Sequence, residues 1–259
     1  MTAAALSIDL NADMGESFGP WPMGDDAALL GVISSANIAC GLHAGDWDVM
    51  DRTMRQAVQG GVGIGAHPGF PDLQGFGRRE MQMPPASAAN LVRYQLGAAR
   101  GVAQAAGGTV RHLKLHGALA NMASRDETLA RACYEGALSV DPEVILMVLA
   151  GTAQERAARA LDARLACEIF ADRGYHDDAT LIARGQPGAM IHDPAEAAPR
   201  IVEMVREGAI IAASGTRIPT RIDTICLHGD NPGAVTLARA VRAALDAAGI
   251  AVAAFTGER

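Results

Sequence analysis

Short apolar, β-branched runs alternate with longer amphipathic segments along this chain, and this alternation restricts its fold more than any other feature. Such alternation is typical of βα units arranged around a parallel sheet. Between the runs, apolar residues recur at helical spacing, as at positions 49–58 and 235–248. The sequence therefore predicts an α/β protein. The expected strands are Ser7–Asp13, Ser35–Cys40, Gly61–His67, Val110–His116, Val144–Leu149, Leu165–Asp172 and Thr224–His228, with weaker candidates at Ala209–Ala213 and Ile250–Phe255.

The length of the chain and the absence of a linker favour one domain. It has 259 residues, and α/β barrels of about 250 residues are commonly a single domain. We find no Ser/Gly linker or change of composition, so we expect residues 1–259 to form one unit. Asp126 is placed to cap a helix that runs to Leu138, and Asn231-Pro232 to begin the last long helix. The segment Gly174–Pro199 lacks periodicity and is expected to be a loop over the active face.

Charge and composition narrow the class of partner. The formal net charge is -7 and no basic stripe occurs, which argues against a nucleic-acid or anionic-membrane surface. The N-terminal segment Met1–Leu10 has no basic start and reaches Asp9 after a short apolar run, so we expect neither a signal peptide nor an anchor, and a cytoplasmic location. Four cysteines without CxxC spacing are expected to be reduced core thiols: Cys40, Cys133, Cys167 and Cys226.

Polar residues gather where the predicted strands end. Because the carboxyl ends of parallel strands share one open face, these residues are candidates for one site. A single strand-end histidine is more often a satisfied core residue, but glycines adjoin nearly every cluster here, which favours a binding face. The candidates are Asn11, Asp13, Glu16, His43, His67, Lys114, His116, Asp172, Arg173, His228 and Asp230.

This set of residue types suits two chemistries. Histidines and carboxylates from several strands serve either general acid–base catalysis or a divalent metal that activates water, and the sequence does not choose between them. Lys114 shares a strand face with His116, so we expect both to point into the barrel mouth, where a lysine needs an anionic partner. The alternative is an outward lysine between helices. No serine lies beside a histidine in a recognisable triad pattern, which disfavours a serine nucleophile. No GxxxxGK[ST] or GxGxxG motif occurs, which disfavours conventional nucleotide loops.

Several blocks of the sequence closely resemble the LamB/YcsF lactam-utilisation family. The resemblance begins with Ile8–Gly19, Ser35–Asp46 and Gly65–Asp72. It continues in family order through Gly75–Arg79, Lys114–Leu119, Phe170–Arg173 and Cys226–Pro232, and so covers practically the whole chain. The resemblance implies an irregular (β/α) barrel of about seven strands, similar to the glycoside hydrolase/deacetylase superfamily.

The resemblance also implies an activity. Members of the family are the A component of an ATP-dependent 5-oxoprolinase, which opens 5-oxo-L-proline to L-glutamate together with B and C subunits. ATP would be a cosubstrate, with Mg expected alongside it and a nucleotide site shared with the partners. Phosphorylation of the lactam carbonyl oxygen would create a leaving group and let water attack. A homo-oligomer and a bound active-site metal are left open.

Roles follow as hypotheses from that chemistry. Asp13 or His67 would activate water, while Lys114, Arg79 or Arg173 would hold phosphate or the substrate carboxylate. The expected catalytic residues are Asp13, His67, Lys114 and His116. The expected substrate-binding residues are Asn11, Glu16, Asn37, His43, Arg79, Asp172, Arg173, His228 and Asp230.

Two alternatives remain beside this activity. One is an ATP-independent metal-dependent amidohydrolase or deacetylase, with Asp13, His43 and His67 as ligands. The other is a noncatalytic lactam-binding subunit. For the site itself, we expect the side chains of Asp13, His43, His67, His116, Asp172 and His228 to border one cavity.

Overall fold

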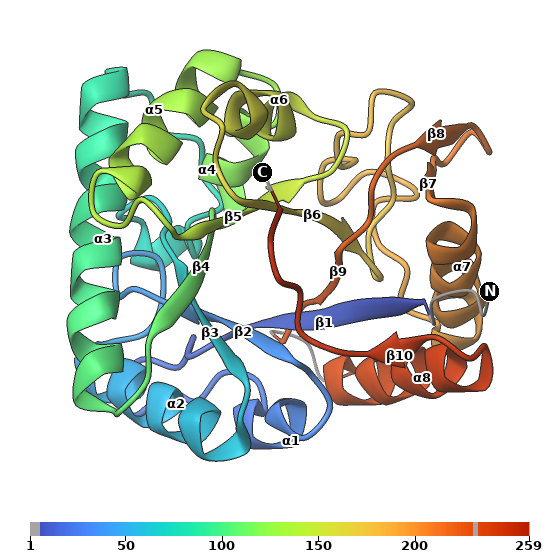
Figure 1. Cartoon of the computed structure of the whole chain (residues 1–259), viewed down its shortest axis with the longest axis horizontal. Helices are drawn as coiled ribbons and strands as arrows, with labels where there is room; N and C mark the ends of the chain where they lie inside the picture. The colour runs from blue at the N-terminus through green and yellow to red at the C-terminus, as the bar shows by residue number, and fades with distance from the viewer. Residues whose placement is uncertain (1–5, 230–232, 259) are drawn as a thin grey trace.

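Seven parallel strands close into a barrel in the computed structural model, which describes residues 6–229 and 233–258 (Figure 1). The strands follow one another around the barrel in chain order, and β9 closes it by pairing with β1. This arrangement confirms the predicted (β/α) barrel. The barrel strands are β1 (Ser7–Met14), β2 (Ser35–Ala39), β3 (Gly63–His67), β4 (Val110–Lys114), β5 (Ile145–Leu149), β6 (Leu165–Phe170) and β9 (Thr224–Leu227).

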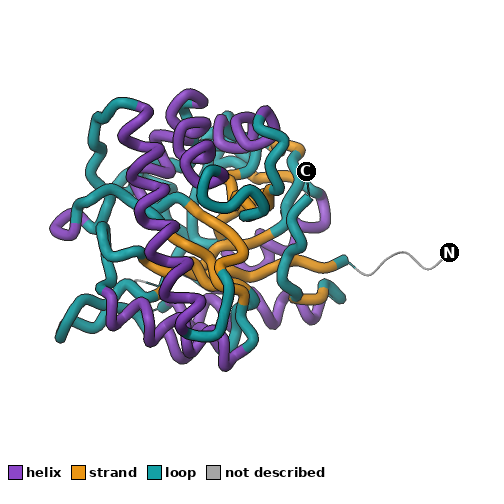
Figure 2. Tube along the Cα trace, turned by 60° about the vertical axis from the view of Figure 1, so that its left-hand side comes forward, coloured by secondary structure: helices purple, strands orange, loops and turns teal. Residues whose placement is uncertain are grey.

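Helices surround these strands on the outside (Figures 1 and 2). Several begin at an acidic or hydroxyl residue whose side chain accepts a hydrogen bond from the first turn; Asp46 and the predicted cap Asp126 are two of them. The helices are α1 (Asp26–Leu30), α2 (Trp47–Gly60), α3 (Pro85–Ala105), α4 (Gly117–Ala123), α5 (Glu127–Leu138), α6 (Ala153–Ala160), α7 (Pro194–Glu207) and α8 (Ala234–Ala247), with a short 3-10 helix at Leu73–Gly75. The predicted helix start at Asn231-Pro232 lies outside the described residues.

The interior of the barrel is polar. Side chains alternate along β1, so that Ile8, Leu10 and Ala12 join the buried apolar core while Asp9 and Asn11 point inward. Asn11 Nδ2 donates to Thr224 Oγ1 at 2.7 Å, and its Oδ1 accepts from Asn37 Nδ2 at 2.7 Å. Buried polar groups are stable when they are hydrogen-bonded in this way.

Two glycines make room in the barrel for larger groups. A Cβ at Gly65 would lie 2.0 Å from Nε2 of His112, so the residue on β3 must be glycine for that ring to fit. Nε2 of His112 lies 2.8 Å from Oδ1 of Asn37. Farther along the chain, Gly77 has φ +62°, and a Cβ there would lie 2.8 Å from the His116 ring. Both close approaches pack the histidines of the barrel against backbone.

Several predicted strand boundaries were wrong. Four of the barrel strands stop before their predicted carboxyl ends, because the backbone turns there to form the loops of the open face; His116, for example, follows β4 and its amide donates to the Pro68 carbonyl. The candidate Ala209–Ala213 is not a barrel strand. Its first residues form β7 (Ala209–Ile211), which is too short to cross the barrel and pairs antiparallel with β8 (Arg217–Pro219).

The last candidate, Ile250–Phe255, shortens to β10 (Ala251–Val252), which pairs parallel with the start of β1. Phe255 lies beyond it and packs against Ile145 and Met147. The predicted loop Gly174–Pro199 is irregular as expected up to Asp193, where the cap of α7 begins the helix.

No helix in the described part of the chain is both long and apolar enough to span a membrane.

Candidate active site

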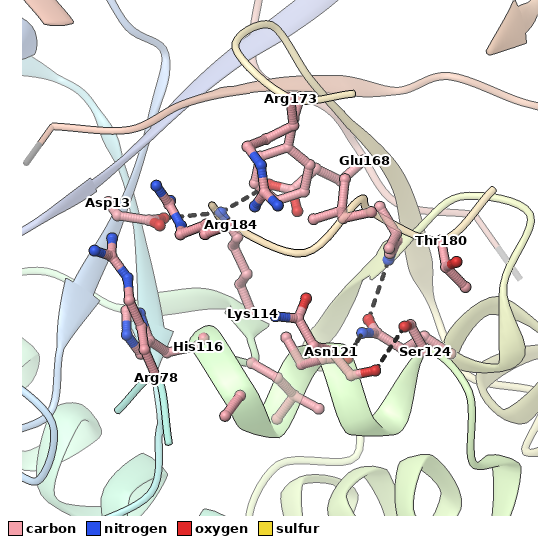
Figure 3. A pocket seen from close by; sticks show the side chains of 18 of the residues that line it. Asp13, Arg78, Lys114, His116, Asn121, Ser124, Glu168, Arg173, Thr180 and Arg184 are labelled. Atoms are coloured by element: carbon pink, nitrogen blue, oxygen red, sulfur yellow. Dashed lines mark hydrogen bonds and ion pairs between the residues drawn. The ribbon is translucent and has the colours of Figure 1, made fainter. Parts of the chain in front are cut away.

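A cavity of about 420 Å³ opens at the carboxyl ends of the barrel strands (Figure 3). Its volume lies within the range of ordinary small-molecule sites. The loops after several strands contribute to it, and the irregular segment after β6 forms part of its wall. The charged and imidazole side chains that line it are Asp13, Glu16, His67, Arg78, Glu80, Lys114, His116, Arg125, Glu168, Arg173, His176, Arg184 and His228.

Lys114 lies in the middle of a buried ion cluster formed with Asp13 and Glu168. Its Nζ is 2.8 Å from Asp13 Oδ1 and 3.0 Å from Glu168 Oε1, and it also donates to Cys226 Sγ at 2.9 Å. These groups come from β4, β1, β6 and β9, so the cluster connects opposite sides of the barrel. A buried lysine requires such partners, because an unpaired charge in the interior is costly.

Burial and charge act in opposite directions on the pKa values of this ion cluster. Burial raises the pKa of Asp13, but the charges of His67 and Lys114 outweigh it and hold that pKa well below its usual range. Burial lowers the pKa of Lys114, but Asp13, Cys226 and Glu168 hold it well above its usual value. For Glu168, burial outweighs the attraction of Lys114, so the pKa is raised. The cluster therefore combines a firmly charged Lys114–Asp13 pair with a second carboxyl group, Glu168, whose pKa is raised.

His67 connects this ion cluster to a second histidine. Its Nδ1 donates to the Lys114 carbonyl at 2.8 Å, which leaves Nε2 facing Asp13 Oδ2 at 3.3 Å and His116 Nδ1 at 3.0 Å. His116 in turn donates from Nε2 to the Phe76 carbonyl at 2.8 Å. The two backbone carbonyls thus fix the ring orientations, as carbonyl partners commonly do for functional histidines. Burial lowers the pKa of His116 well below its usual value, so this ring is neutral.

His43 packs directly against this pair. Its ring stacks on His116 at 3.7 Å between centroids and meets His67 edge to face at 5.5 Å. Neither ring nitrogen of His43 has a hydrogen-bond partner among the described residues. Burial lowers the pKa of His43 well below its usual value, so it too is a neutral imidazole with an available lone pair.

His228 and Asp172 form a separate pair at the edge of the cavity. His228 Nδ1 lies 2.8 Å from Asp172 Oδ2, and the ring stacks on Phe170 at 5.1 Å. Burial raises the pKa of Asp172, but the His228 charge outweighs it and the pKa is lowered. Asp172, which does not border the cavity, therefore fixes the orientation of the His228 ring, and His228 borders the cavity.

The segment that follows β6 is fixed to the cavity by Arg173. Its Nε donates to the Ala189 carbonyl at 3.1 Å and its Nη2 to the Ile182 carbonyl at 2.6 Å. Burial, followed by repulsion from Arg184, lowers the pKa of Arg173 to about 10. Arg173 thus borders the cavity but uses two of its nitrogens to hold the loop that carries Arg184.

The structure separates the predicted site residues into groups. Of the six expected to border one cavity, Asp13, His67, His116 and His228 do so, whereas His43 and Asp172 lie directly behind them. Lys114 points inward as predicted, and Leu113 is buried in the apolar core, whereas Leu115 is buried but also borders the cavity. Glu16 also borders the cavity.

Besides His43 and Asp172, three further predicted substrate-binding residues do not border the cavity. Asn11 and Asn37 lie deeper in the barrel, where they bond to each other and to their neighbours. Arg79 points away: its side chain is 66% exposed and binds Asp72. Its neighbour Arg78 borders the cavity instead. The remaining predicted residue, Asp230, lies outside the described residues.

The sequence interpretation also missed site residues. Glu168 stands in the apolar run of β6, and the argument that gives Lys114 an anionic partner could have found it. Cys226, predicted to be a plain core thiol, is buried but contacts Lys114. Arg78 and Arg184 lie in irregular loops, where periodicity does not indicate the direction of a side chain.

Among the residues that the structure describes, two groups of side chains have the composition of a divalent-metal site. The ligand atoms of Glu16, His43, His67 and His116 lie within 4.8 Å of one another, as do those of Asp13, Cys226 and His228. The first group fits better, because His43 has unpartnered nitrogens and His67 and His116 each donate their other nitrogen to a carbonyl. The predicted ligand Asp13 is paired with Lys114.

Comparison with known proteins gives consistent matches. The LamB/YcsF family model matches residues 8–259. A Ruegeria pomeroyi protein, named as the A component of 5-oxoprolinase, is 66% identical over 96% of this chain and 98% of its own length. A Heliobacterium modesticaldum protein of the same name is 52% identical over 95% and 97%.

Two solved structures share the fold. The lactam utilization protein from Thermus thermophilus superimposes with a TM-score of 0.90 at 44% identity, covering 96% of this chain and 100% of that one. An Enterococcus faecalis protein proposed to cleave cellobiose phosphate superimposes with a TM-score of 0.54 at 15% identity, covering 97% and 98%, and is similar in fold alone.

Proposed function

The chain belongs to the LamB/YcsF family, and from that premise we propose that it is the lactam-opening component of an ATP-dependent 5-oxoprolinase. The reaction would convert 5-oxo-L-proline to L-glutamate with hydrolysis of ATP. The relatives named as the A component of 5-oxoprolinase support the substrate. The observation that carries the proposal is the ion cluster of Lys114, Asp13 and Glu168 beside His67, at a cavity that fits a small ligand.

The cluster suits the chemistry of ring opening. An amide is a poor electrophile, so its carbonyl oxygen must be stabilised or phosphorylated before water can attack. Lys114 Nζ is held by Asp13 and Glu168 and offers a fixed positive charge to that oxygen or to a phosphoryl group. Because these partners hold Lys114 in place before substrate binds, little reorganisation is needed during the reaction.

Proton transfer is assigned to His67, with Asp13 and His116 as its supports. His67 Nε2 points toward the Asp13 carboxylate and His116 Nδ1, and its Nδ1 is occupied by the Lys114 carbonyl. When water adds to the carbonyl carbon and the ring C–N bond breaks, the nitrogen needs a proton and the water must lose one. His67 is placed to carry that proton. A general acid–base group positioned in this way typically raises the reaction rate by about 10²–10⁴-fold.

Arg78 is the proposed anchor for the substrate carboxylate. It borders the cavity, and its guanidinium lies over the Phe76 ring at 4.8 Å from the centroid. Arg184, on the loop held by Arg173, borders the same cavity and would meet an anionic group from another side. Arginine suits this role because its planar donors match a carboxylate or phosphate.

Phosphoryl transfer would need partner subunits. The sequence has no conventional nucleotide loop. We therefore propose that ATP, with Mg, binds at a site completed by B and C subunits. The test is glutamate formation from 5-oxoproline by the purified chain alone, by the B and C subunits alone, and by all three together. Only the complete mixture with ATP should turn over, and turnover by the isolated chain would contradict the partner requirement.

A second candidate rests on the histidine group. Glu16, His43, His67 and His116 could hold a divalent metal, which would supply a polarised water to an ATP-independent amidohydrolase. The unpartnered nitrogens of His43 are the observation in its favour. Equal turnover without ATP, together with a stoichiometric metal in the purified chain, would favour this candidate over the first.

A further inference from the structure

Exposed large apolar side chains are concentrated on one face of this molecule. Both tryptophans of the chain are exposed, Trp21 at 68% and Trp47 at 79%. With Phe18 and Met23 they form what we call the apolar patch. Leu73, also exposed, lies on the next loop. All five follow the carboxyl ends of β1, β2 or β3, so the apolar patch shares its face with the cavity. Contiguous exposed apolar groups of this kind mark interaction surfaces.

The apolar patch is held in shape by the backbone. Phe18 and Trp21 form a short antiparallel bridge and their rings stack at 6.4 Å between centroids. The amide of Gly19 donates to Asp46 Oδ2 at 2.7 Å, which connects this loop to the residue before Trp47. Ser17 and Met23 are joined by a further hydrogen bond. The two tryptophans are therefore presented on fixed neighbouring loops, which reduces the entropy lost on binding.

The position of the apolar patch also links it to the reaction. Glu16 borders the cavity, and Phe18 follows it by two residues. A partner that supplies ATP to this cavity must approach the same face, because the cavity opens at the carboxyl ends of the strands. The carboxylates Asp25 and Asp48, which closely follow Met23 and Trp47 in the sequence, are exposed, so a partner with basic residues around an apolar centre fits this surface.

We propose that the apolar patch of Phe18, Trp21, Met23 and Trp47 is the docking surface for the assembly of B and C subunits, which thereby covers the cavity mouth. This inference rests on the proposed function, since it takes the partner from that reaction. Tryptophans at the centre of an interface commonly dominate binding, whereas the surrounding polar contacts contribute little. Trp21 and Trp47 are therefore the anchors of this surface.

The experiment compares the full-length chain with the double variant Trp21→Ala/Trp47→Ala, using purified B–C assembly as the probe. Tyr94→Ala is the matched control, because Tyr94 is equally exposed, at 69%, but lies on α3. Titration calorimetry should show a loss of at least about thirtyfold in affinity for the double variant, and a change within about twofold for Tyr94→Ala. Turnover of the double variant should recover as the B–C assembly is raised, because the cavity is untouched. Thermal melting of all three proteins checks their folding.

Each other outcome overturns the proposal in a different way. If the wild-type chain binds B–C and turns over, but the double variant binds equally well, the docking surface is wrong and the proposed function stands. If the wild-type chain neither binds B–C nor turns over with it, the proposed function fails as well. If light scattering shows that the double variant instead disrupts a homo-oligomer while its affinity for B–C is unchanged, a second copy of the chain covers the apolar patch.

Discussion

Lys114 on β4 and Asp13 on β1 reach across the barrel, and their ion pair of 2.8 Å closes the bottom of the cavity. The pair connects two strands that are not neighbours in the sheet. Along the shorter path around the barrel, β2 and β3 lie between β1 and β4. Removing either partner should therefore affect catalysis and the closure of the barrel at once. The two effects can be separated by comparing variants of Asp13 with variants of Lys114. Loss of Asp13 leaves Lys114 paired with Glu168, whereas loss of Lys114 leaves both carboxyl groups without their cation.

Asp13→Asn should reduce turnover of the reconstituted enzyme by at least about a hundredfold, as should His67→Ala, because each disrupts the proton-carrying pair. Asp13→Asn should leave the protein folded, since Glu168 still neutralises Lys114. The measurement is the turnover rate beside the melting temperature. Asp9→Asn is the control: Asp9 is buried on the same strand but bonds to Ser35 and Thr224 below the cavity, so it should lower the melting temperature more than the rate. If Asp13→Asn and His67→Ala simply unfold the chain, both residues are structural.

Lys114→Met should destabilise the protein by about 3–5 kcal/mol, because it leaves two buried carboxylates without their cation. Adding Glu168→Gln to Lys114→Met should recover part of that loss, whereas it should not restore turnover. Urea denaturation of the single and double variants measures the free energy of unfolding. Equal stability of the two variants would mean that Glu168 does not share the charge of Lys114.

Arg78→Ala should raise the KM for 5-oxoproline by about 10- to 100-fold, the scale of a lost charge-assisted hydrogen bond, and should change kcat less. Arg79→Ala is the matched control from the next position, because its side chain is exposed and binds Asp72 outside the cavity. It should leave KM within about twofold. A larger effect of Arg79→Ala than of Arg78→Ala would contradict the placement of the carboxylate anchor.

His112 should make stability depend on pH below about 6.5. Burial lowers its pKa to about 3 in the folded chain, so below the unfolded pKa of about 6.5 the unfolded state gains a proton that the folded state does not. The free energy of unfolding is therefore highest above that pH, and this group reduces it by roughly 1.4 kcal/mol per pH unit as the pH falls toward 3. His112→Gln should remove that part of the slope in denaturation measured between pH 5 and 7.

The sequence predicted the barrel because its strands are short, buried apolar runs that alternate with amphipathic helices. The positions of Asp13, His67 and Lys114 followed from the rule that strand ends share one face, and all three border the cavity. The register across the barrel was beyond that reasoning, since it depends on how the strands pair. The sequence indicates that Lys114 needs an anionic partner, but the contact with Glu168 in particular and the deeper placement of Asn37 are known from the structure.

The roles of the remaining site residues could not be predicted, because these residues lie in irregular loops. Arg78 and Arg79 are adjacent in an irregular segment, and only the backbone conformation there, with Phe76 at φ 54° and Gly77 at φ 62°, decides which of them faces the cavity. The role of Arg173 was also hidden, because its hydrogen-bond partners are carbonyls of residues 182 and 189, far along the same loop. Strand ends identify the region of a site, whereas loop conformation determines its members.

A crystal structure of this chain with 5-oxoproline tests the central claim most directly. The lactam should lie in the cavity at the carboxyl face, with its carbonyl oxygen within hydrogen-bonding distance of Lys114 Nζ or His67 and its carboxylate toward Arg78. A ring bound outside the cavity, or bound inside it with the carbonyl directed away from Lys114 and His67, would contradict the assignment of this cluster to ring opening.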